Sequence, residues 1–311
     1  MEAAILEEFG SKLSVKEQPT PEPKEGEVLV KIKASGVNPV DAKLAQGYMK
    51  DRLPHEFPMI LGWDMAGIVE KRGHGARRFS VGDEVFAYAR RPELNNHGTF
   101  ADYISVPESY LAKKPINISF EEAGAIPLAG LTAYQCLFEV GKVKLDDTVM
   151  ILGASGGVGS FAVQMAKYEG AQVVAVASKE NHDYLRELGA DHCLDYKSQK
   201  IEEVIWDIVP DGVDLVFDAV GGGATLQGAR SLKEGGRLIS ITNQGDGLPD
   251  HIRFHFVFTE PNARQLDHIR EMVEAGTLKV NITKEYNLDN INDAFKQIET
   301  GHTTGKIVVK M

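Results

Sequence analysis

The sequence predicts an α/β protein that combines a doubly wound parallel sheet with a second, mainly antiparallel β domain. Its 311 residues exceed what one hydrophobic core usually supports, so two domains are expected. The first part of the chain contains β-type runs broken by glycine and proline. From about residue 120, short apolar strands alternate with amphipathic helices, which is typical of a parallel sheet with crossover helices.

The first and last parts of the chain share an antiparallel β character. Within residues 1–118, the segments Glu27–Lys33 and Asp83–Tyr88 alternate apolar and polar side chains with a period of two. Such alternation suits a sheet that packs one face on a core and leaves the other half-exposed. Residues 278–311 return to β-like runs with a short helix around Asn290–Glu299, so we expect them to fold back onto the first domain.

The middle of the chain, residues 119–277, is expected to carry six strands with helices between them. The helix Val158–Glu169 is followed by Gly170, the residue type that commonly ends a helix. The helix His182–Leu188 is likewise followed by Gly189. Six strands joined in this way describe a Rossmann-type domain. The expected strands are Thr148–Leu152, Gln172–Ala177, His192–Asp195, Leu215–Asp218, Arg237–Ile241 and Arg253–Phe258.

Composition and charge exclude several classes of function. The formal net charge of −11 disfavours a nucleic-acid partner, because phosphate binding needs a positive surface. No apolar run approaches the roughly 18 residues needed to cross a bilayer, and the acidic first residues do not resemble a signal peptide. Two cysteines, Cys136 and Cys193, build no disulfide framework. We therefore expect a cytoplasmic protein with neither a nucleic-acid nor a membrane partner.

The strongest local feature is the segment Gly-Ala-Ser-Gly-Gly-Val-Gly at 153–159, directly after the expected strand Thr148–Leu152. Glycines allow a tight turn and a close approach of the backbone to a pyrophosphate, and a helix N-terminus offers free N–H groups to an anion. Ala154 stands at the first glycine position of the strict motif, and an ordinary strand–helix turn is the alternative. The expected dinucleotide-binding residues are Ser155, Gly156, Gly157, Val158 and Gly159.

The end of the next strand indicates which cofactor is bound. In NAD-binding domains an acidic residue about 20 positions after the glycine motif holds the ribose 2′-hydroxyl. Here Ser178 and Lys179 occupy that place, and no carboxylate follows until Glu180. A hydroxyl and an ammonium suit a 2′-phosphate, whereas a carboxylate would repel it. The residues therefore predict NADPH, with the alternative that Lys179 only begins a solvated loop.

Several segments match one family in order along nearly the whole chain. Residues 34–43 contain Asn-Pro-Val-Asp, and residues 57–69 read Phe-Pro-Met-Ile-Leu-Gly-Trp-Asp-Met-Ala-Gly-Ile-Val. These segments resemble the N-P-x-D and f-P-x-x-x-G-x-[DE]-x-x-G-x-V signatures of the medium-chain dehydrogenase/reductase superfamily, in its quinone oxidoreductase and enone reductase branches. The resemblance implies a GroES-like catalytic domain, a Rossmann domain and an active site in the cleft between them. The other matching segments are 98–103, 126–134, 217–222 and 304–309.

The resemblance implies that Asn38 and Asp41 belong to the active site, as an amide donor and as a residue that orients its neighbours. Lys43 and Tyr48 are candidate donors to the substrate oxygen or proton sources. The residues alone leave other interpretations open. Asn38 before Pro39 suits a turn, and Asp41 suits a helix N-cap. Tyr48 also suits a partly buried loop aromatic.

Further cofactor-binding residues follow from the same resemblance. Thr132 matches a position that contacts the nicotinamide. Tyr196 matches one beside the 2′-phosphate in the members that use NADPH. Loops after the fourth and fifth strands fall where the nicotinamide end is flanked, and the last matching segment adds a lysine. These remaining cofactor-binding residues are Val220, Gly221, Thr242 and Lys306.

Zinc is not expected. A catalytic zinc needs three protein ligands with an open fourth position. Zinc-dependent members of the superfamily supply Cys, His and Cys, and the resemblance aligns these with Asn38, Trp63 and Leu128. Two cysteines in total also cannot build a four-cysteine structural site.

The predicted reaction follows from this lack of a Lewis acid. Without a metal, formation of an alkoxide from an ordinary alcohol loses its main electrostatic support. Quinones and conjugated enones delocalise negative charge themselves, so the sequence predicts hydride transfer from NADPH to a small-molecule quinone or to the β-carbon of an enone. Two alternatives stay open: a non-catalytic NADPH-binding sensor or scaffold, and an alcohol dehydrogenase-like activity on another carbonyl substrate.

The segment Arg253–Phe258 predicts a homodimer. As the sixth strand it lies at a sheet edge, where unpaired N–H and C=O groups invite another chain. The resemblance implies that two such edges join about a two-fold axis. The alternative is that the phenylalanines pack under a helix such as Ala263–Glu274. The apolar residues on one face of the segment are Ile252, Phe254, Phe256 and Phe258.

Overall fold

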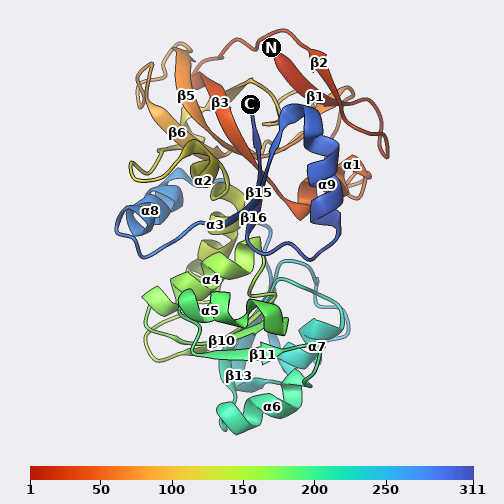
Figure 1. Ribbon diagram of the computed structural model, residues 1–311, viewed down its shortest axis with the longest axis vertical. Coiled ribbons are helices and arrows are strands. Elements are labelled where there is room, and N and C mark those ends of the chain that lie inside the picture. Colours follow the sequence, from red (N-terminus) through yellow and green to blue (C-terminus); the bar gives the residue numbers. More distant parts are fainter. The chain divides into compact units, whose positions relative to one another are not determined.

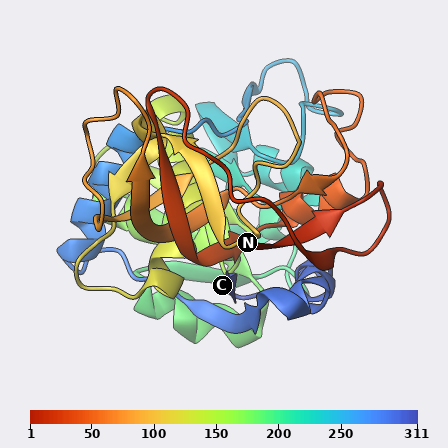
Figure 2. The ribbon, with the colours of Figure 1, turned by 90° about the horizontal axis from the view of Figure 1, so that it is seen from above.

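The computed structural model describes all 311 residues, and the chain divides into two compact units. Unit 1 comprises Met1–Leu131, Glu260–Gly276 and Val280–Met311. Unit 2 comprises Thr132–Thr259 and Thr277–Lys279. Both termini therefore belong to unit 1, and Figure 2 marks them there. The expected α/β class is confirmed, because unit 1 is mainly antiparallel and unit 2 contains a parallel sheet.

A seven-stranded sheet forms the centre of unit 1. Its order is β15-β16-β3-β5-β6-β8, and β7 also pairs with β3. Neighbouring strands are antiparallel except for β15 and β16. Alternating residues such as Val30, Met65 and Val85 pack into one buried core. The strands are β3 (Glu27–Val37), β5 (Asp64–Arg72), β6 (Glu84–Tyr88), β7 (Tyr103–Pro107), β8 (Leu111–Lys113), β15 (Ile282–Asn287) and β16 (Lys306–Lys310).

A smaller antiparallel sheet of order β2-β1-β4 and several helices complete unit 1. The helix α2 (Phe120–Gly124) begins at a capping box. The Ser119 hydroxyl accepts from the Glu122 N–H at 3.1 Å, and the Glu122 carboxylate accepts from the Ser119 N–H at 2.9 Å. The other elements are β1 (Glu2–Leu6), β2 (Ser14–Glu17), β4 (Met59–Ile60), α1 (Pro39–Ala45), α8 (Ala263–Glu274), α9 (Ile291–Glu299), η1 (Glu108–Tyr110) and η4 (Leu288–Asn290). The helix α3 (Pro127–Tyr134) begins in unit 1 and continues into unit 2 from Thr132.

Unit 2 contains a six-stranded parallel sheet of order β11-β10-β9-β12-β13-β14. Counted along the chain this is 3-2-1-4-5-6, the doubly wound order expected for a Rossmann-type domain. The helices α4 and α5 lie on one side of the sheet, and α6 and α7 lie on the other (Figure 1). The elements are β9 (Thr148–Leu152), β10 (Gln172–Ala177), β11 (His192–Asp195), β12 (Val213–Asp218), β13 (Leu232–Ser240), β14 (Arg253–Phe256), α4 (Gly157–Tyr168), α5 (His182–Glu187), α6 (Ile201–Ile208), α7 (Gly223–Ala229), η2 (Gln135–Val140) and η3 (Lys179–Asn181).

The element bounds agree with expectation for three strands of the parallel sheet and differ for others. The strands β9, β10 and β11 have the expected bounds. The strand β13 begins at Leu232 rather than Arg237, because Leu232 pairs with Val213 of β12 ahead of a register shift. The strand β14 ends at Phe256 rather than Phe258. Length and apolarity together fall short of a membrane span in every helix.

Two segments expected in the nucleotide-binding domain group with unit 1. The helix α8 belongs to this unit, where the Asn117 amide donates to the Val273 carbonyl at 3.1 Å and the Ile116 N–H donates to Glu274 Oε1 at 3.2 Å. The helix α2 packs on β3 and β5. Within unit 2, Phe254 of β14 packs on the apolar cluster around Leu238.

Candidate functional site

Unit 1 contains a buried cluster of four polar side chains that come from three elements. Asn38 precedes α1 and Asp41 lies in its first turn. Asp64 is the first residue of β5, and Lys306 is the first residue of β16. The two carboxyl residues are fully buried, and Asn38 and Lys306 each keep 4% exposure. The cluster therefore concentrates three ionisable groups in a site that water reaches poorly.

Hydrogen bonds orient the amide of Asn38. Its Nδ2 donates to Asp64 Oδ2 at 2.8 Å, and its Oδ1 accepts from the Lys306 ammonium. Its backbone N–H donates to Asp41 Oδ2 at 2.8 Å, which completes a capping box at α1. Asp64 Oδ1 accepts from the Leu128 N–H at 2.6 Å. The carboxylate and the ammonium together determine which way the Asn38 amide faces.

Burial controls the ionisation of this cluster. Burial raises the pKa of Asp41 to about 8, and the nearby Asp64 charge adds to that rise. Burial also raises the pKa of Asp64, against the attraction of Lys306, and it lowers the pKa of Lys306. Asp41 Oδ1 is buried without a hydrogen-bond partner, whereas Asp64 accepts bonds on both oxygens. Asp41 is therefore the carboxyl best placed to hold a proton at neutral pH, and Asp64 is the one best placed to be ionised.

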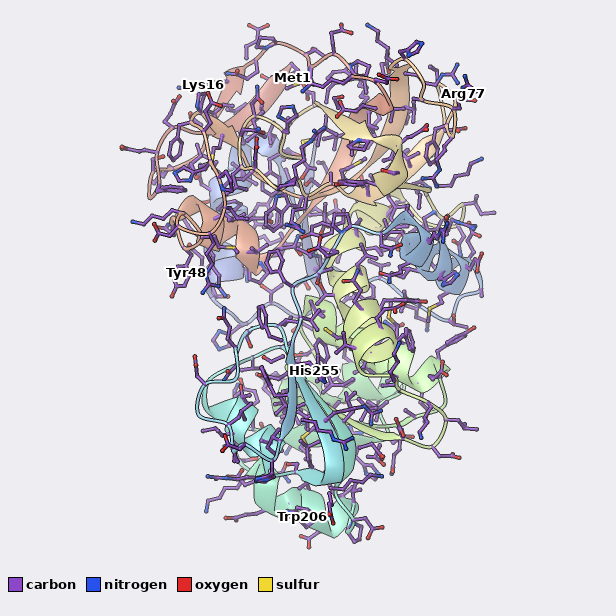
Figure 3. All side chains as sticks on the ribbon, turned by 180° about the vertical axis from the view of Figure 1, so that it is seen from behind. Met1, Lys16, Tyr48, Arg77, Trp206 and His255 are labelled. Carbon is purple, nitrogen blue, oxygen red and sulfur yellow. The ribbon has the colours of Figure 1, made fainter.

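Lys43 and Tyr48 do not join the hydrogen bonds of this cluster. Lys43 lies on α1 with an exposed side chain. Tyr48 follows that helix and is 80% exposed, among the outermost side chains of unit 1 in Figure 3. Their assignment as proton sources stays a prediction that depends on how a substrate approaches them.

The structure adds residues to this site that the sequence interpretation missed. Asp64 pairs in register with Tyr88 of β6, whose ring lies 6.0 Å from the Trp63 ring. The Ser35 hydroxyl donates to the Asp64 carbonyl at 2.6 Å and contacts the Thr99 hydroxyl at 2.8 Å. The acidic position of the 57–69 signature was the signal for Asp64, because a carboxylate inside an apolar strand needs a partner.

The glycine-rich turn of unit 2 is built as the motif requires. Gly153 follows β9 with a φ of +75°, a value that favours glycine. A Cβ on Gly159 would overlap the Gly153 carbonyl oxygen and lie 2.7 Å from Ala154 Cα. Gly156 is the N-cap of α4, so Gly157 and the next residues present the free N–H groups of a helix start. The predicted residues thus form one turn at the carboxyl end of β9, and their role in binding an anion stays a prediction.

Ser178 and Tyr196 lie close together at the carboxyl ends of two neighbouring strands of the parallel sheet. Ser178 follows β10 and Tyr196 follows β11, and these parallel strands pair with Ala177 opposite Asp195. The Ser178 hydroxyl accepts from the Asn181 amide at 3.1 Å, and Tyr196 is 50% exposed. A hydroxyl and a phenol ring therefore border one corner of the sheet, which also contains Lys179 in η3.

Asp218 holds the loops that are expected at the nicotinamide end. It was not identified as a site residue from the sequence. Its Oδ1 accepts from the N–H groups of Val220 and Gly221, each at 2.9 Å. Its Oδ2 accepts from the Ser240 hydroxyl at 2.9 Å, which ties the end of β12 to the end of β13. Thr242 follows β13, and its backbone N–H donates to the Ser240 hydroxyl. These loops belong to unit 2, as does Thr132. Lys306 instead belongs to the buried cluster of unit 1.

Comparisons with known proteins identify the family. The model of the alcohol dehydrogenase GroES-like domain matches residues 24–116, and that of the zinc-binding dehydrogenase matches 188–309. An NADPH-dependent alkenal/one oxidoreductase of Arabidopsis thaliana is 37% identical over 296 residues, covering 93% of this chain and 73% of the relative. The chain belongs to the medium-chain dehydrogenase/reductase superfamily, in its quinone and enone oxidoreductase branch.

Other members of the superfamily match over greater lengths. A quinone-oxidoreductase homolog of Spinacia oleracea is 32% identical over 306 residues, covering 93% of this chain and 91% of the relative. The solved structure of the quinone oxidoreductase from Coxiella burnetii superposes with a TM-score of 0.89 and 31% identity, covering 100% of this chain and 99% of that one. The GroES-like and Rossmann-type architecture expected from the sequence is thereby confirmed.

One of the two matching families is described as zinc-binding, but the residues of this chain at the zinc-ligand positions do not suit the metal. Asn38 uses its amide on Asp64 and Lys306. Trp63 packs its indole on Tyr88, and Leu128 contributes only a backbone N–H near the cluster. No group of three histidine, cysteine or acidic side chains is placed to hold a metal ion. The donor chemistry at this site is that of hydrogen bonds and one ion pair.

Proposed function

We propose that this chain is an NADPH-dependent oxidoreductase that transfers a hydride to a quinone or an α,β-unsaturated carbonyl compound without zinc. The observation that carries the proposal is the bonding of Asn38. The amide stands where zinc-dependent members provide a cysteine ligand, and Asp64 and Lys306 hold it. The names of two relatives, an alkenal/one oxidoreductase and a quinone-oxidoreductase homolog, support the acceptor class and the cofactor.

Each unit contributes a separate part of the proposed chemistry. NADPH, when bound, supplies the hydride. The turn at Gly153–Gly159 and the N-terminus of α4 hold the pyrophosphate through backbone N–H groups. Ser178 and Lys179 hold the 2′-phosphate, because a hydroxyl and an ammonium both donate to phosphate oxygens. The Asp218 loops orient the nicotinamide end through Val220 and Gly221.

The buried cluster of unit 1 serves the acceptor end. Ionised Asp64 and Lys306 neutralise each other, and Asp41 holds a proton on its carboxyl group. The Asn38 Nδ2 group has one strong bond, to Asp64, and a weaker contact at 3.5 Å to the Gly36 carbonyl. Its second N–H is the donor that this cluster offers to a developing oxyanion.

An NADPH-oxidation screen tests the proposal. The acceptors are quinones, alkenals, cyclic enones and saturated aldehydes, with product analysis and with metal content measured before and after chelation. We expect turnover with quinones or enones, reduction of the conjugated double bond in the enones, and activity that survives chelation. Binding of NADPH without turnover of any acceptor would favour the sensor or scaffold alternative. Reduction of saturated aldehydes instead of quinones and enones would favour the alcohol dehydrogenase-like alternative.

We further propose a homodimer that forms through β14. This strand is one of the two outer strands of the parallel sheet and is paired only with β13. Phe256 on this strand is 40% exposed, although its neighbour Phe254 packs on the core of unit 2. An unpaired strand edge with an exposed phenylalanine favours pairing with a second copy. Light scattering on the purified protein at micromolar concentration tests this assignment.

A cytoplasmic location is also part of the proposal. It rests on the low cysteine content, two in 311 residues, and on an overall charge of −11 that suits a dissolved protein rather than a polyanion-bound one. The full names of both relatives call them chloroplastic, so the location of this chain is tested separately from its activity. Fractionation of the source cells, followed by detection of the chain in the soluble or the organelle fraction, decides between the two.

A further inference from the structure

The carboxylate of Glu180 lies in the corner that the proposed function gives to the 2′-phosphate of NADPH. The Lys197 ammonium is 2.9 Å from Glu180 Oε1. The nearby Glu180 N–H, together with this ammonium and the Ser178 hydroxyl, lowers the pKa of the carboxyl group to about 2. The group is therefore an anion at any physiological pH, surrounded by donors from two different strand ends.

The surrounding structure fixes the Ser178 side chain and the Lys197 backbone independently of Glu180. Ser178 follows β10, and its hydroxyl accepts from Asn181 at 3.1 Å, which leaves its own hydrogen for an anion. Lys197 follows β11, and its backbone N–H donates to Asp195 Oδ1 at 3.0 Å. Its ammonium lies 6.0 Å from the centre of the Tyr196 ring. The corner thus contains a hydroxyl with a free hydrogen and an ammonium that a carboxylate of the chain itself engages.

A hydroxyl, an ammonium and a backbone N–H are the donors that phosphate oxygens use. A phosphate carries a charge near −2 at neutral pH, so it and the Glu180 carboxylate repel each other if both occupy the corner. Glu180 is 64% exposed along its side chain and can turn outward into water. In NADH, by contrast, the ribose carries a 2′-hydroxyl that can donate to a carboxylate.

We propose that Glu180 is an internal competitor for the 2′-phosphate of NADPH, and that Lys197 becomes a phosphate ligand when this carboxylate is displaced. Glu180 then narrows the preference for NADPH over NADH by weakening the binding of NADPH. The inference rests on the proposed use of NADPH, and it assigns a specificity role to two residues outside the glycine-rich motif.

Binding measurements on single variants test it. Dissociation constants for NADPH, NADH and adenosine 2′,5′-bisphosphate are measured by titration on the wild type, Glu180→Gln, Lys197→Gln and Glu203→Gln. The last variant is a matched control, because Glu203 is also 64% exposed and pairs with Lys200 at 2.8 Å. We expect Glu180→Gln to tighten NADPH and the bisphosphate by about two- to fivefold, the range of an exposed charge interaction, and to leave NADH unchanged or weaker. Lys197→Gln should weaken NADPH by a similar factor without affecting NADH.

The outcomes separate this inference from the proposed cofactor. Unchanged or weaker binding of NADPH by Glu180→Gln would overturn it, as would equal tightening of NADPH and NADH. The same change in Glu203→Gln would also overturn it, because the effect would then come from net charge alone. A wild type that binds NADPH no better than NADH would instead contradict the proposed cofactor preference itself. A wild type that prefers NADPH, together with a silent Glu180→Gln, contradicts only the inference.

Discussion

The Lys306 ammonium lies 3.7 Å from Asp64 Oδ2 in the core of unit 1, although the two residues start strands that do not pair with each other. The strands β16 and β5 both flank β3, and Asn38, just after β3, bridges the ion pair with its amide. A buried ion pair matters for stability mainly because loss of one partner leaves the other charge buried without compensation. Lys306 is therefore a structural part of the Asn38 site, whatever further contact it makes with a cofactor.

Replacing Lys306 by methionine should destabilise the protein strongly. The change leaves the Asp64 carboxylate buried without its cation, which typically costs about 3–5 kcal/mol. Urea unfolding measures the loss. The control is Lys310→Met on the same strand, where an exposed pair with Glu285 is removed and stability should change far less. A stable Lys306→Met protein with weakened NADPH binding would instead favour the role of cofactor ligand alone.

Asp41 should make stability depend on pH. Its pKa of about 8 in the folded protein lies above the ordinary value of 3.8, so the folded state holds a proton that the unfolded state releases between those values. Stability from this group is therefore fully present below about pH 4 and decreases as the pH rises toward 8, by at most about 1.4 kcal/mol per pH unit. The charges of Asp64 and Lys306 act on the same carboxyl group, because Asp64 raises its pKa and Lys306 lowers it.

The variant Asp41→Asn checks this expectation, because an amide has nearly the shape of the neutral acid. We expect its stability relative to the wild type to increase between pH 5 and pH 8, as measured by urea unfolding at each pH. Asp183→Asn removes a carboxylate that is 95% exposed and should show no such trend. A constant difference between Asp41→Asn and the wild type across this range would contradict a protonated Asp41.

Ser178→Asp should reverse much of the cofactor preference. The new carboxylate repels a 2′-phosphate and offers an acceptor to the 2′-hydroxyl of NADH. Loss of a charge-assisted hydrogen bond typically costs about 1.5–3 kcal/mol, which corresponds to roughly tenfold to hundredfold weaker NADPH binding. Dissociation constants for both cofactors measure this, and Ser178→Ala separates lost bonding from added repulsion. Equal constants for NADPH and NADH in the wild type would disprove the assignment.

Two glycines of the nucleotide turn should respond differently to alanine. At Gly159 the new Cβ meets the Gly153 carbonyl oxygen and lies 2.7 Å from Ala154 Cα, so Gly159→Ala should cost about 1–3 kcal/mol and lower both stability and NADPH affinity. At Gly156 the nearest atom would be 3.4 Å away, so Gly156→Ala should keep its Tm and weaken only cofactor binding. Thermal unfolding and NADPH titration distinguish the two. Equal Tm values for both variants would argue against the packing role of Gly159.

Proline at His255, in β14, should weaken the proposed dimer. His255 pairs with Ile239 of β13 at the sheet edge, and Figure 3 labels it on this strand. Proline removes an N–H from a strand and disturbs the edge that a second copy would meet. Light scattering should give about twice 34.1 kDa for the wild type and a lower mass for His255→Pro. Phe256→Ser keeps the strand intact and tests the exposed ring separately. A wild-type mass near 34.1 kDa at micromolar concentration would rule out the dimer.

The nucleotide-binding half of the molecule could be predicted well because its signals are local. The glycine turn follows β9 within a few residues, and apolar strands such as β10 define their own bounds. The buried cluster could be predicted only in part. Asn38 and Asp41 lie in one short motif, but the contact of Lys306 with Asp64 depends on how β16 and β5 are placed around β3. The spacing of residues in the sequence does not reveal which strands lie on either side of β3.

The place of β16 in the sheet also bears on how unit 1 is made in the cell. This strand pairs with β3 and supplies the cation of the buried cluster. The ribosome nevertheless synthesises it only after all of unit 2. Until then Asp64 has no counter-charge and one side of β3 lacks its hydrogen-bonding neighbour. Nascent chains therefore contain a finished nucleotide-binding unit beside an incomplete one, and chaperones that capture unpaired strands should meet this protein through β3.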